Sequence, residues 1–201
     1  ALLCCEAPAP CACLVAPHII SPSALTLGGE IARGNFGAVH WAQHHENGHG
    51  NGGRLCVVKR ACTPDDGNHH RVAAAAVEYL EVEADINELM AERLPDEHAG
   101  QQQIAPYLGR AAIGGEPHLV FAACGEHTLD TYLSRGAEGR RELARALDVD
   151  DNDDGGSELA RRVLHDTLSA LAFVHARGIV HRDVKPENLV VDADQHCLRL
   201  I

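Results

Sequence analysis

The sequence has few aromatic side chains and no excess of positive charge. Phe, Trp and Tyr together make up 3% of its 201 residues, and the formal net charge is −12. Proteins that bind nucleic acid usually carry a basic patch, so we expect no nucleic-acid partner for so acidic a chain. No apolar run reaches the roughly 20 consecutive residues that a membrane-spanning helix needs. We therefore expect no membrane span within this chain.

None of the eight cysteines belongs to a C-x-x-C pair. Zinc ribbons use such pairs, so a zinc ribbon is not predicted. Four cysteines lie within the first thirteen residues, and the others are isolated in apolar runs. We interpret the isolated ones as buried thiols of a reducing, intracellular compartment.

Strand patterns come first along the chain, and helical patterns dominate later. Residues 1–24, rich in Ala, Pro and Cys, are expected to form a disordered or loosely attached leader. Apolar runs separated by turn-forming residues predict strands, namely two over 25–41 and one each at 54–61, 105–113 and 117–124. This order favours an α+β fold with a sheet-rich half and a helical half.

Apolar residues spaced three and four apart predict two long helices. The first spans 71–94, with its stripe formed by Ala76, Leu80, Ile86, Met90 and Leu94. The second spans 158–177, with one face formed by Val163, Leu164, Leu168, Leu171 and Val174. A short helix is expected at 128–135, and the polar, acidic stretch 136–157 is interpreted as an insertion.

The densest cluster of charge is "HRDVKPEN", residues 181–188. Pro186 forbids a continuous helix there, so Asp183 and Asn188 are expected on a loop. A carboxylate can accept the proton of a hydroxyl, and an amide oxygen can bind a hard cation. Lys185 between them supplies a positive charge for a phosphate oxygen. A solvated charged turn is the alternative interpretation.

Two weaker features precede this loop. Gly34 and Gly37 lie in a turn between two strands, where backbone amides can approach a polyphosphate without a clash with Cβ atoms. An ordinary hairpin explains the same pattern. Lys59 ends an apolar strand, where a lysine usually extends its ammonium into water. An acidic helix follows, so an ion pair between that helix and Lys59 is also possible.

A glycine-rich hairpin, a strand lysine, an acidic helix and H-R-D-x-K-P-x-N occur in this order in protein kinases. From residue 25 to residue 201 the sequence resembles a eukaryotic-type protein kinase catalytic domain of the Ser/Thr type. The resemblance implies an antiparallel, five-stranded small lobe with one helix over 25–122. It also implies an incomplete helical large lobe over 123–201, with 136–157 as its insertion. Residues 158–201 would then expose the apolar face that normally meets the other helices of that lobe.

The resemblance implies the roles of the site residues as well. Asp183 would be the base that orients the substrate hydroxyl, Lys185 would contact the transferring phosphate, and Asn188 would bind the metal. ATP and Mg²⁺ are the implied cofactors, and a protein with a Ser or Thr hydroxyl is the implied substrate. The residues expected around the nucleotide are Ile31, Gly34, Gly37, Val39, Val57, Lys59, Glu83, Phe121, Cys124 and Val190.

The sequence departs from the family pattern in three places. Ala32 stands where the first glycine of the nucleotide loop is usual. The acidic partner of Lys59 is ambiguous: Glu83 is favoured because it lies on the apolar stripe of the helix, and Glu88 is the alternative. In the family, the strand that resembles "CLRLI" leads into Asp-Phe-Gly, which holds the principal magnesium ion. We therefore expect the 201-residue chain by itself to be an incomplete and inactive fragment.

Two alternatives to a protein kinase are kept. One is a pseudokinase-like module that binds nucleotide or serves as a scaffold, and the other is a small-molecule phosphotransferase of kinase-like fold. Within protein kinases, "VFAACGEHTLDTYL" is similar to the thylakoid state-transition kinases of plants and algae. That partial similarity implies a chloroplast location. The oligomeric state is not fixed by the sequence.

Overall fold

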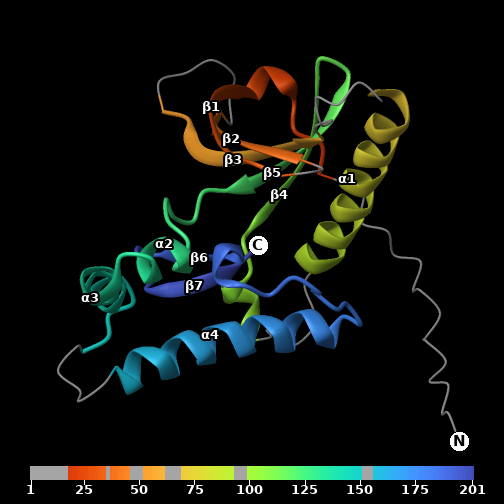
Figure 1. Cartoon of the computed structure of the whole chain (residues 1–201). Coiled ribbons are helices and arrows are strands. Elements are labelled where there is room, and N and C mark those ends of the chain that lie inside the picture. Colours follow the sequence, from red (N-terminus) through yellow and green to blue (C-terminus); the bar gives the residue numbers. More distant parts are fainter. Residues whose placement is uncertain (1–17, 35–36, 46–51, 62–68, 93–98, 151–155) are drawn as a thin grey trace, which may run out of the picture.

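The computed structural model describes residues 18–34, 37–45, 52–61, 69–92, 99–150 and 156–201. A sheet-rich half forms the upper part of Figure 1, and a helical half that also holds a small two-stranded sheet forms the lower part. The sheet-rich half has five strands, all paired in antiparallel fashion in the order β1-β2-β3-β5-β4. The strands are β1 (Leu25–Arg33), β2 (Gly37–His44), β3 (Arg54–Ala61), β4 (Tyr107–Ile113) and β5 (Glu116–Ala122). The α+β prediction with a five-stranded antiparallel sheet is confirmed.

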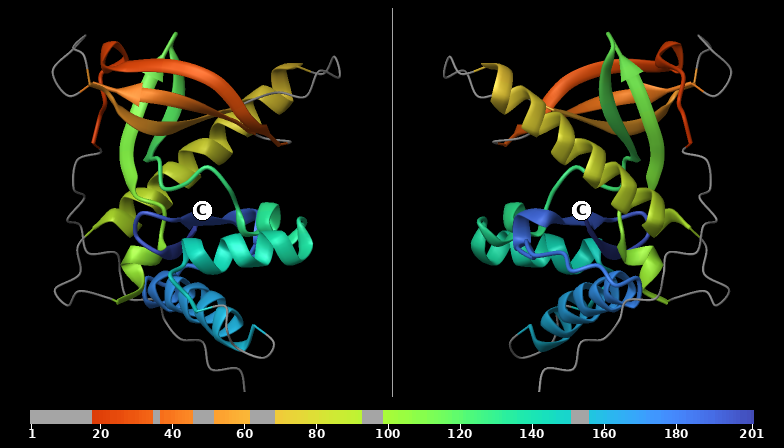
Figure 2. Two further views of the ribbon diagram at one scale, coloured as in Figure 1. Left: turned by 90° about the vertical axis from the view of Figure 1, so that its left-hand side faces the viewer. Right: turned by 90° about the vertical axis from the view of Figure 1, so that its right-hand side faces the viewer.

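The middle of the five-stranded sheet packs on both faces, because its side chains alternate between two small cores. Cys56, Val58 and Val120 lie in the core of one face. On the other face, Leu119 packs against Leu80 and Ala84 of helix α1 (His69–Ala91). Figure 2 shows α1 crossing this face of the sheet obliquely. The helix is thereby held directly against strands β3, β5 and β4.

Residues 18–24 pack against the sheet, in contrast to the loosely attached leader expected over 1–24. Ile20 is buried in the core that also holds Cys56 and Val58. Its N–H donates to the carbonyl of Arg110 at 2.7 Å, so the segment adds to the edge of β4. A short 3₁₀ helix (Pro22–Ala24) then leads into β1. Residues 1–17 lie outside the described part of the chain.

Helix α1 buries a narrower stripe than the sequence predicts. Ala76 and Leu80 are buried as expected, but the next buried position is Ala84, whereas Ile86 is 37% exposed. Ala76, Leu80 and Ala84 are spaced four apart and so lie on one face of the helix, whereas Ile86 lies outside it. Met90, also predicted, packs against the core of the lower half. The predicted stripe member Leu94 lies outside the described residues.

The lower half contains helices α2 (Leu129–Leu133), α3 (Gly136–Ala146) and α4 (Ser157–Ala176), with the hairpin of β6 (Leu189–Asp192) and β7 (Cys197–Leu200). Two 3₁₀ turns, Ala99–Gln103 and Pro186–Asn188, complete it. Its core is centred on Phe173, Leu143 and Leu198, which are almost fully buried. Among the described residues no helix is long and apolar enough to cross a membrane.

Helix α3 occupies the first half of the stretch that was interpreted as an acidic insertion. Its charged residues face water, while Leu143 and Ala144 are buried in the core. Gly139 allows the close contact with α2, because a Cβ there would lie 1.9 Å from the carbonyl oxygen of Tyr132. Because most residues of this stretch are polar, its few apolar positions did not indicate one face of an amphipathic helix. Residues 151–155 of the stretch lie outside the described part.

Helix α4 buries a stripe that only partly matches the predicted one, since Val163, Leu171 and Val174 pack in or against the core as predicted. Leu159, Asp166 and Ala170 face the core, together with Phe173 and Val174. Leu164 and Leu168 are 59% and 61% exposed, so these two members of the predicted face point outward. The lower half therefore presents an apolar surface along α4, as expected for residues 158–201.

Candidate functional site

The loop before β6 brings Asp183, Lys185 and Asn188 together. One carboxylate oxygen of Asp183 accepts hydrogen bonds from Lys185 Nζ at 2.8 Å and from Asn188 Nδ2 at 2.9 Å. Asn188 Nδ2 also donates to the Asp183 carbonyl at 2.8 Å. The 3₁₀ turn that begins at Pro186 makes this possible, since it folds Asn188 back towards Lys185. The three predicted catalytic residues thus form one hydrogen-bonded cluster.

The charge of Asp183 is set by these neighbours. The hydrogen bond from the Lys185 ammonium, and then that from Asn188, hold the pKa of Asp183 below its ordinary value. The same contact raises the pKa of Lys185. Asp183 is therefore an ionised carboxylate at neutral pH, and its side chain is 61% exposed. It can receive a hydrogen bond from a hydroxyl group that approaches from solvent.

Backbone geometry at the same loop fixes where Asp183 points. Arg182 has φ = 66°, in the left-handed region that a side chain other than glycine rarely adopts. His181 stabilises this turn, because its Nδ1 accepts the N–H of Asp183 at 3.3 Å. Its Nε2 contacts the carbonyl of Ile201 at 3.0 Å, which assigns the proton to Nε2. The loop is thereby attached to the residue that follows β7.

Lys59 pairs with Glu83 across the gap between β3 and α1. Its Nζ lies 2.6 Å from both carboxylate oxygens, and both side chains are about one-third exposed. Glu88, the alternative left open by the sequence, instead lies 2.5 Å from Arg110. The choice follows from helix geometry, because Glu83 and Glu88 project from different sides of α1.

The glycine-containing turn lies next to Lys59. The N–H of Gly34 donates to the carbonyl of Gly37 at 2.8 Å, which closes the turn between β1 and β2. A Cβ atom at Gly37 would lie 3.2 Å from Cε of Lys59, so this glycine leaves space for the lysine. Val39 is the cross-strand neighbour of both Lys59 and Ala32. Ile31, also expected over the nucleotide, is 41% exposed on β1.

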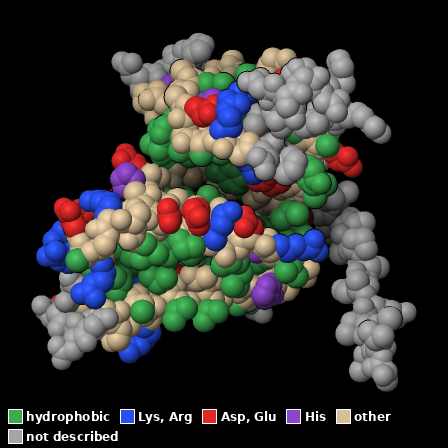
Figure 3. Space-filling view, viewed as in Figure 1, with side chains coloured by type: hydrophobic (Ala, Val, Ile, Leu, Met, Phe, Trp, Pro, Cys, Tyr) green, Lys and Arg blue, Asp and Glu red, His purple; other side chains and the backbone are tan. Residues whose placement is uncertain are grey.

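The remaining predicted residues lie where the two halves join. Val57 is paired with Phe121 across β3 and β5, and Phe121 contacts the ring of Tyr107 edge-on at 5.4 Å. Burial raises the pKa of Cys124 to about 11, so this thiol stays protonated. Val190 lies on β6 in the lower half. Figure 3 shows that the surface is hollowed between the two halves.

The connection between the halves is tightly packed. A Cβ atom at Gly125 would lie 2.2 Å from the carbonyl oxygen of Val191, so glycine lets the connection rest on β6. The N–H of Val191 donates to the carbonyl of His127 at 3.0 Å. Site residues of the upper half are thus held in a defined place above the loop that carries Asp183.

Comparison with known proteins identifies the family. Residues 26–201 match the family model described as protein kinase domain. The chain belongs to the protein kinase family. The prediction made from its motif order is confirmed, and by family the domain is that of a protein Ser/Thr kinase.

Several curated kinases share segments with this kinase domain. It is 54% identical to CBL-interacting protein kinase 20 of Oryza sativa over a segment of 39 residues. This segment covers 19% of this chain and 8% of the relative. It is 42% identical to serine/threonine-protein kinase D of Synechocystis over a segment of 89 residues. This segment covers 41% of this chain and 18% of the relative. CBL-interacting serine/threonine-protein kinase 12 of Arabidopsis thaliana is 54% identical over 35 residues, or 17% of this chain and 7% of the relative. The matched segments thus span less than a fifth of each of these relatives.

One residue of this kinase domain that the sequence reasoning missed is Arg110 of β4. It contacts Glu81, Asp85 and Glu88 of α1, whose spacings of four and three place them on one face of the helix. That spacing was visible in the sequence. The position of an arginine opposite to it was not, because the pairing of β4 with β5 and the packing of α1 both had to be known.

Proposed function

We propose that this kinase domain transfers the terminal phosphoryl group of ATP to Ser or Thr hydroxyls of protein substrates. The observation that carries the proposal is the cluster in which Lys185 and Asn188 both donate to the carboxylate of Asp183. The relative from Synechocystis, named a serine/threonine-protein kinase, supports the class of acceptor.

The residues divide the chemistry between them. Asp183, ionised and exposed, accepts the hydrogen bond of the substrate hydroxyl and takes its proton as the new O–P bond forms and the bond to the leaving ADP breaks. Lys185, beside it, and Lys59, held by Glu83, carry the positive charges that stabilise phosphate oxygens. Substrate positioning and charge stabilisation account for most of the catalysis in this reaction class.

Asn188 fits the role of a magnesium ligand. In both of its contacts with Asp183 the amide nitrogen is the donor, so the amide oxygen is the atom available to a hard cation. Within the described residues, no group of three or more His, Cys, Asp or Glu side chains is arranged to hold a metal ion. This suits Mg²⁺ held largely by nucleotide phosphates with one or two protein ligands. When bound, Mg²⁺ supplies neutralisation of phosphate charge.

A finer proposal concerns residues 1–201 expressed as a polypeptide by themselves. We propose that this polypeptide binds ATP but transfers phosphate poorly. The resemblance to protein kinases places a second magnesium-binding carboxylate directly after the strand equivalent to β7, and one metal site supplies only part of the charge stabilisation. A role as a nucleotide-binding scaffold is the second candidate function, favoured by the exposed apolar side chains Leu164 and Leu168.

The location of the protein is also a proposal. The described residues include free Cys56, Cys124 and Cys197, of which Cys56 and Cys197 are buried. Buried free thiols persist in reducing compartments, so we propose an intracellular location. The partial similarity to thylakoid kinases makes the chloroplast the compartment to examine first.

Nucleotide binding tests the part of the proposal that concerns ATP. ATP is titrated with and without Mg²⁺ into wild type, Lys59→Ala and the control Arg54→Ala, which removes another cation from the same strand. We expect wild type and Arg54→Ala to bind equally and Lys59→Ala to bind at least about tenfold more weakly, since charge-assisted contacts contribute roughly 1.5–3 kcal/mol. Equal affinities of wild type and Lys59→Ala would contradict the proposal.

A further inference from the structure

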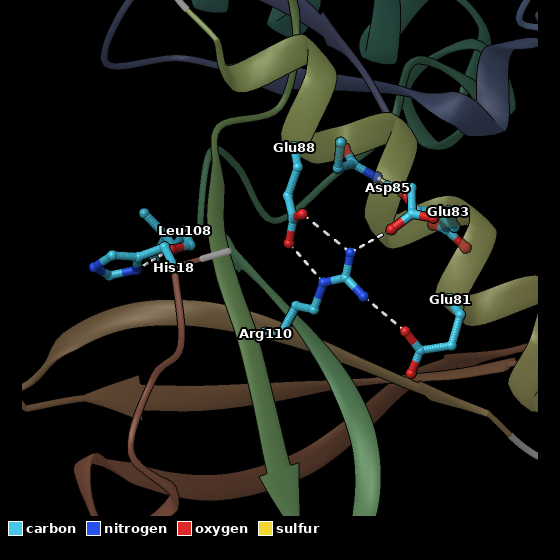
Figure 4. Close-up of polar contacts among 8 residues, drawn as sticks. His18, Glu81, Glu83, Asp85, Glu88, Leu108 and Arg110 are labelled. Carbon is cyan, nitrogen blue, oxygen red and sulfur yellow. Dashed lines mark hydrogen bonds and ion pairs between the residues drawn. The ribbon is translucent and has the colours of Figure 1, made fainter. Parts of the chain in front are cut away.

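Arg110 of β4 makes a fork of ionic hydrogen bonds to helix α1. Figure 4 shows its guanidinium between three carboxylates of the helix. Nε and Nη2 reach the two oxygens of Glu88 at 2.5 and 3.0 Å. Nη1 lies 2.7 Å from Glu81, and Nη2 lies 2.5 Å from Asp85. The Arg110 and Glu88 side chains are 21% and 24% exposed, so the two-pronged pair is the most shielded part of the cluster.

One cation with several N–H donors can stabilise three neighbouring carboxylates at once. Glu81, Asp85 and Glu88 follow one another on one face of α1, where like charges four residues apart repel. A guanidinium has five N–H donors in a rigid plane and can bind a carboxylate through two of them. A lysine in the same place would offer a single charged point. The hydrogen bond to Glu88 accordingly raises the pKa of Arg110.

Apolar packing alone gives α1 little anchorage. Its contact with the sheet buries Leu80 and Ala84 against Leu119, in the smallest of the three cores. Large apolar side chains elsewhere on the helix are exposed, namely Val77, Tyr79, Val82, Ile86 and Leu89. The place of the helix against the sheet therefore depends strongly on its polar contacts.

Arg110 and Lys59 hold the two flanks of this helix from one row of the sheet. Both are cross-strand neighbours of Leu119, Lys59 from β3 and Arg110 from β4. Glu83 lies between Glu81 and Asp85 in the sequence, and residues of a helix rise about 1.5 Å each. Contacts to Glu81 and Asp85 on one flank therefore set the height and rotation at which Glu83 projects from the other.

We propose that Arg110 is a positioning residue that holds α1 where Glu83 meets Lys59. Arg110 touches neither Lys59 nor Glu83 through any contact described for it, and it acts on them through the helix. The inference rests on the proposed function, because the Lys59–Glu83 pair has its value in holding nucleotide phosphates. The candidate site thereby includes the influence of a residue on β4, an edge strand of the sheet.

The segment before β1 reinforces the same point of the sheet. Arg110 N–H donates to the carbonyl of His18 at 2.9 Å, and Arg110 accepts the N–H of Ile20 at 2.7 Å. His18 Nδ1 also lies 2.7 Å from the carbonyl of Leu108. Residues 18–20 thus pair with the backbone of the residue whose side chain holds α1. The attachment of this segment and the position of the helix are linked through β4.

The experiment compares nucleotide affinity in matched variants. Wild type, Arg110→Met, Arg110→Lys and the control Arg135→Met are titrated with ATP and Mg²⁺. Arg135 pairs with Glu142 in the lower half, so its loss removes an ion pair away from α1. We expect Arg110→Met to bind ATP about tenfold more weakly, as typical of coupling between sites, with Arg110→Lys intermediate and Arg135→Met unchanged.

Repeating the comparison in a Glu83→Gln variant distinguishes an effect of Arg110 on the position of α1 from an effect on overall stability. In Glu83→Gln, Arg110→Met should cause little further loss of ATP affinity, because residues that act through one contact are not additive. The loss of thermal stability caused by Arg110→Met should be the same in both backgrounds.

Two results overturn the inference while the proposed function stands: ATP affinity of Arg110→Met equal to that of wild type, or an equal fold-loss with and without Glu83→Gln. A wild type that does not bind ATP overturns the proposed function and this inference with it.

Discussion

Lys59 and Arg110 stand on opposite sides of Leu119 in a single row across the five-stranded sheet. Each projects from the face that packs against α1, and each pairs with acidic side chains of that helix. Leu119, 1% exposed, fills the space between them. A central apolar contact with a cation on either side fixes the helix more completely than burial alone, because the ion pairs have preferred directions and burial does not.

Replacing Asp183 by Asn should separate catalysis from binding. The amide keeps the size of the side chain and its ability to accept hydrogen bonds, but it cannot take a proton. We expect phosphoryl transfer by the natural full-length protein to fall by about 10²–10⁴-fold, as is typical for loss of a general base. ATP affinity should change little, since Asp183 faces the hydroxyl substrate. Rates with a Ser/Thr peptide and a separate ATP titration test both halves of this prediction.

The pH dependence of the rate should reveal the influence of Lys185 on Asp183. The base must be ionised, and the lysine lowers its pKa. Activity is therefore retained until the pH falls through this lowered pKa, and Lys185→Met should move the acid limb of the rate profile to higher pH. Profiles of kcat/KM against pH for wild type and variant measure the shift. An unchanged acid limb would contradict the assignment of this limb to Asp183.

The sequence predicts the chemistry of the loop well because the information there is local. Asp183, Lys185 and Asn188 lie within six positions, and the short turn that begins at Pro186 folds Asn188 back towards Lys185. The strands were found for a similar reason, since alternation and turn residues are local signals.

The predictions that were wrong depend on contacts between segments that are distant in the sequence. The packing of Ile20 on the sheet depends on β4, which lies ninety positions later in the chain. No local sequence pattern predicts this contact. The stripes of α1 and α4 were partly misassigned because both helices carry apolar residues on more than one side, as Ile86 and Leu164 show. Which side is buried depends on the neighbours, and the open partner of Lys59 was settled only by the rotation of α1.

The core of the lower half should depend on Phe173. Its side chain is fully buried and lies under the guanidinium of Arg177, 3.7 Å from the ring centre. Phe173→Ala should lower the free energy of unfolding by about 3–5 kcal/mol through lost burial and the cavity left behind. Leu168→Ala, at a position that is 61% exposed on the same helix, is the matched control, and its effect should stay within about 0.5 kcal/mol. Urea unfolding of the three proteins gives the comparison.

Gly109 should be required for the segment before β1 to attach. It has φ = 141°, and a Cβ atom there would lie 2.1 Å from the carbonyl oxygen of His18. Gly109→Ala must therefore strain the backbone or displace residues 18–20, which uncovers Ile20 and frees the edge of β4. We expect a lower melting temperature and faster hydrogen exchange at the amides of Ile20 and Arg110.

Gly29→Ala is the control for this substitution, because a Cβ atom at Gly29 meets no described atom within 4 Å. If residues 18–20 support α1 through Arg110, Gly109→Ala should also weaken ATP binding in the same direction as Arg110→Met, by a smaller factor. Faster exchange at Ile20 with unchanged ATP affinity would show that the segment covers the sheet without influencing the helix. Unchanged exchange at Ile20 would contradict the close packing of Gly109 against His18.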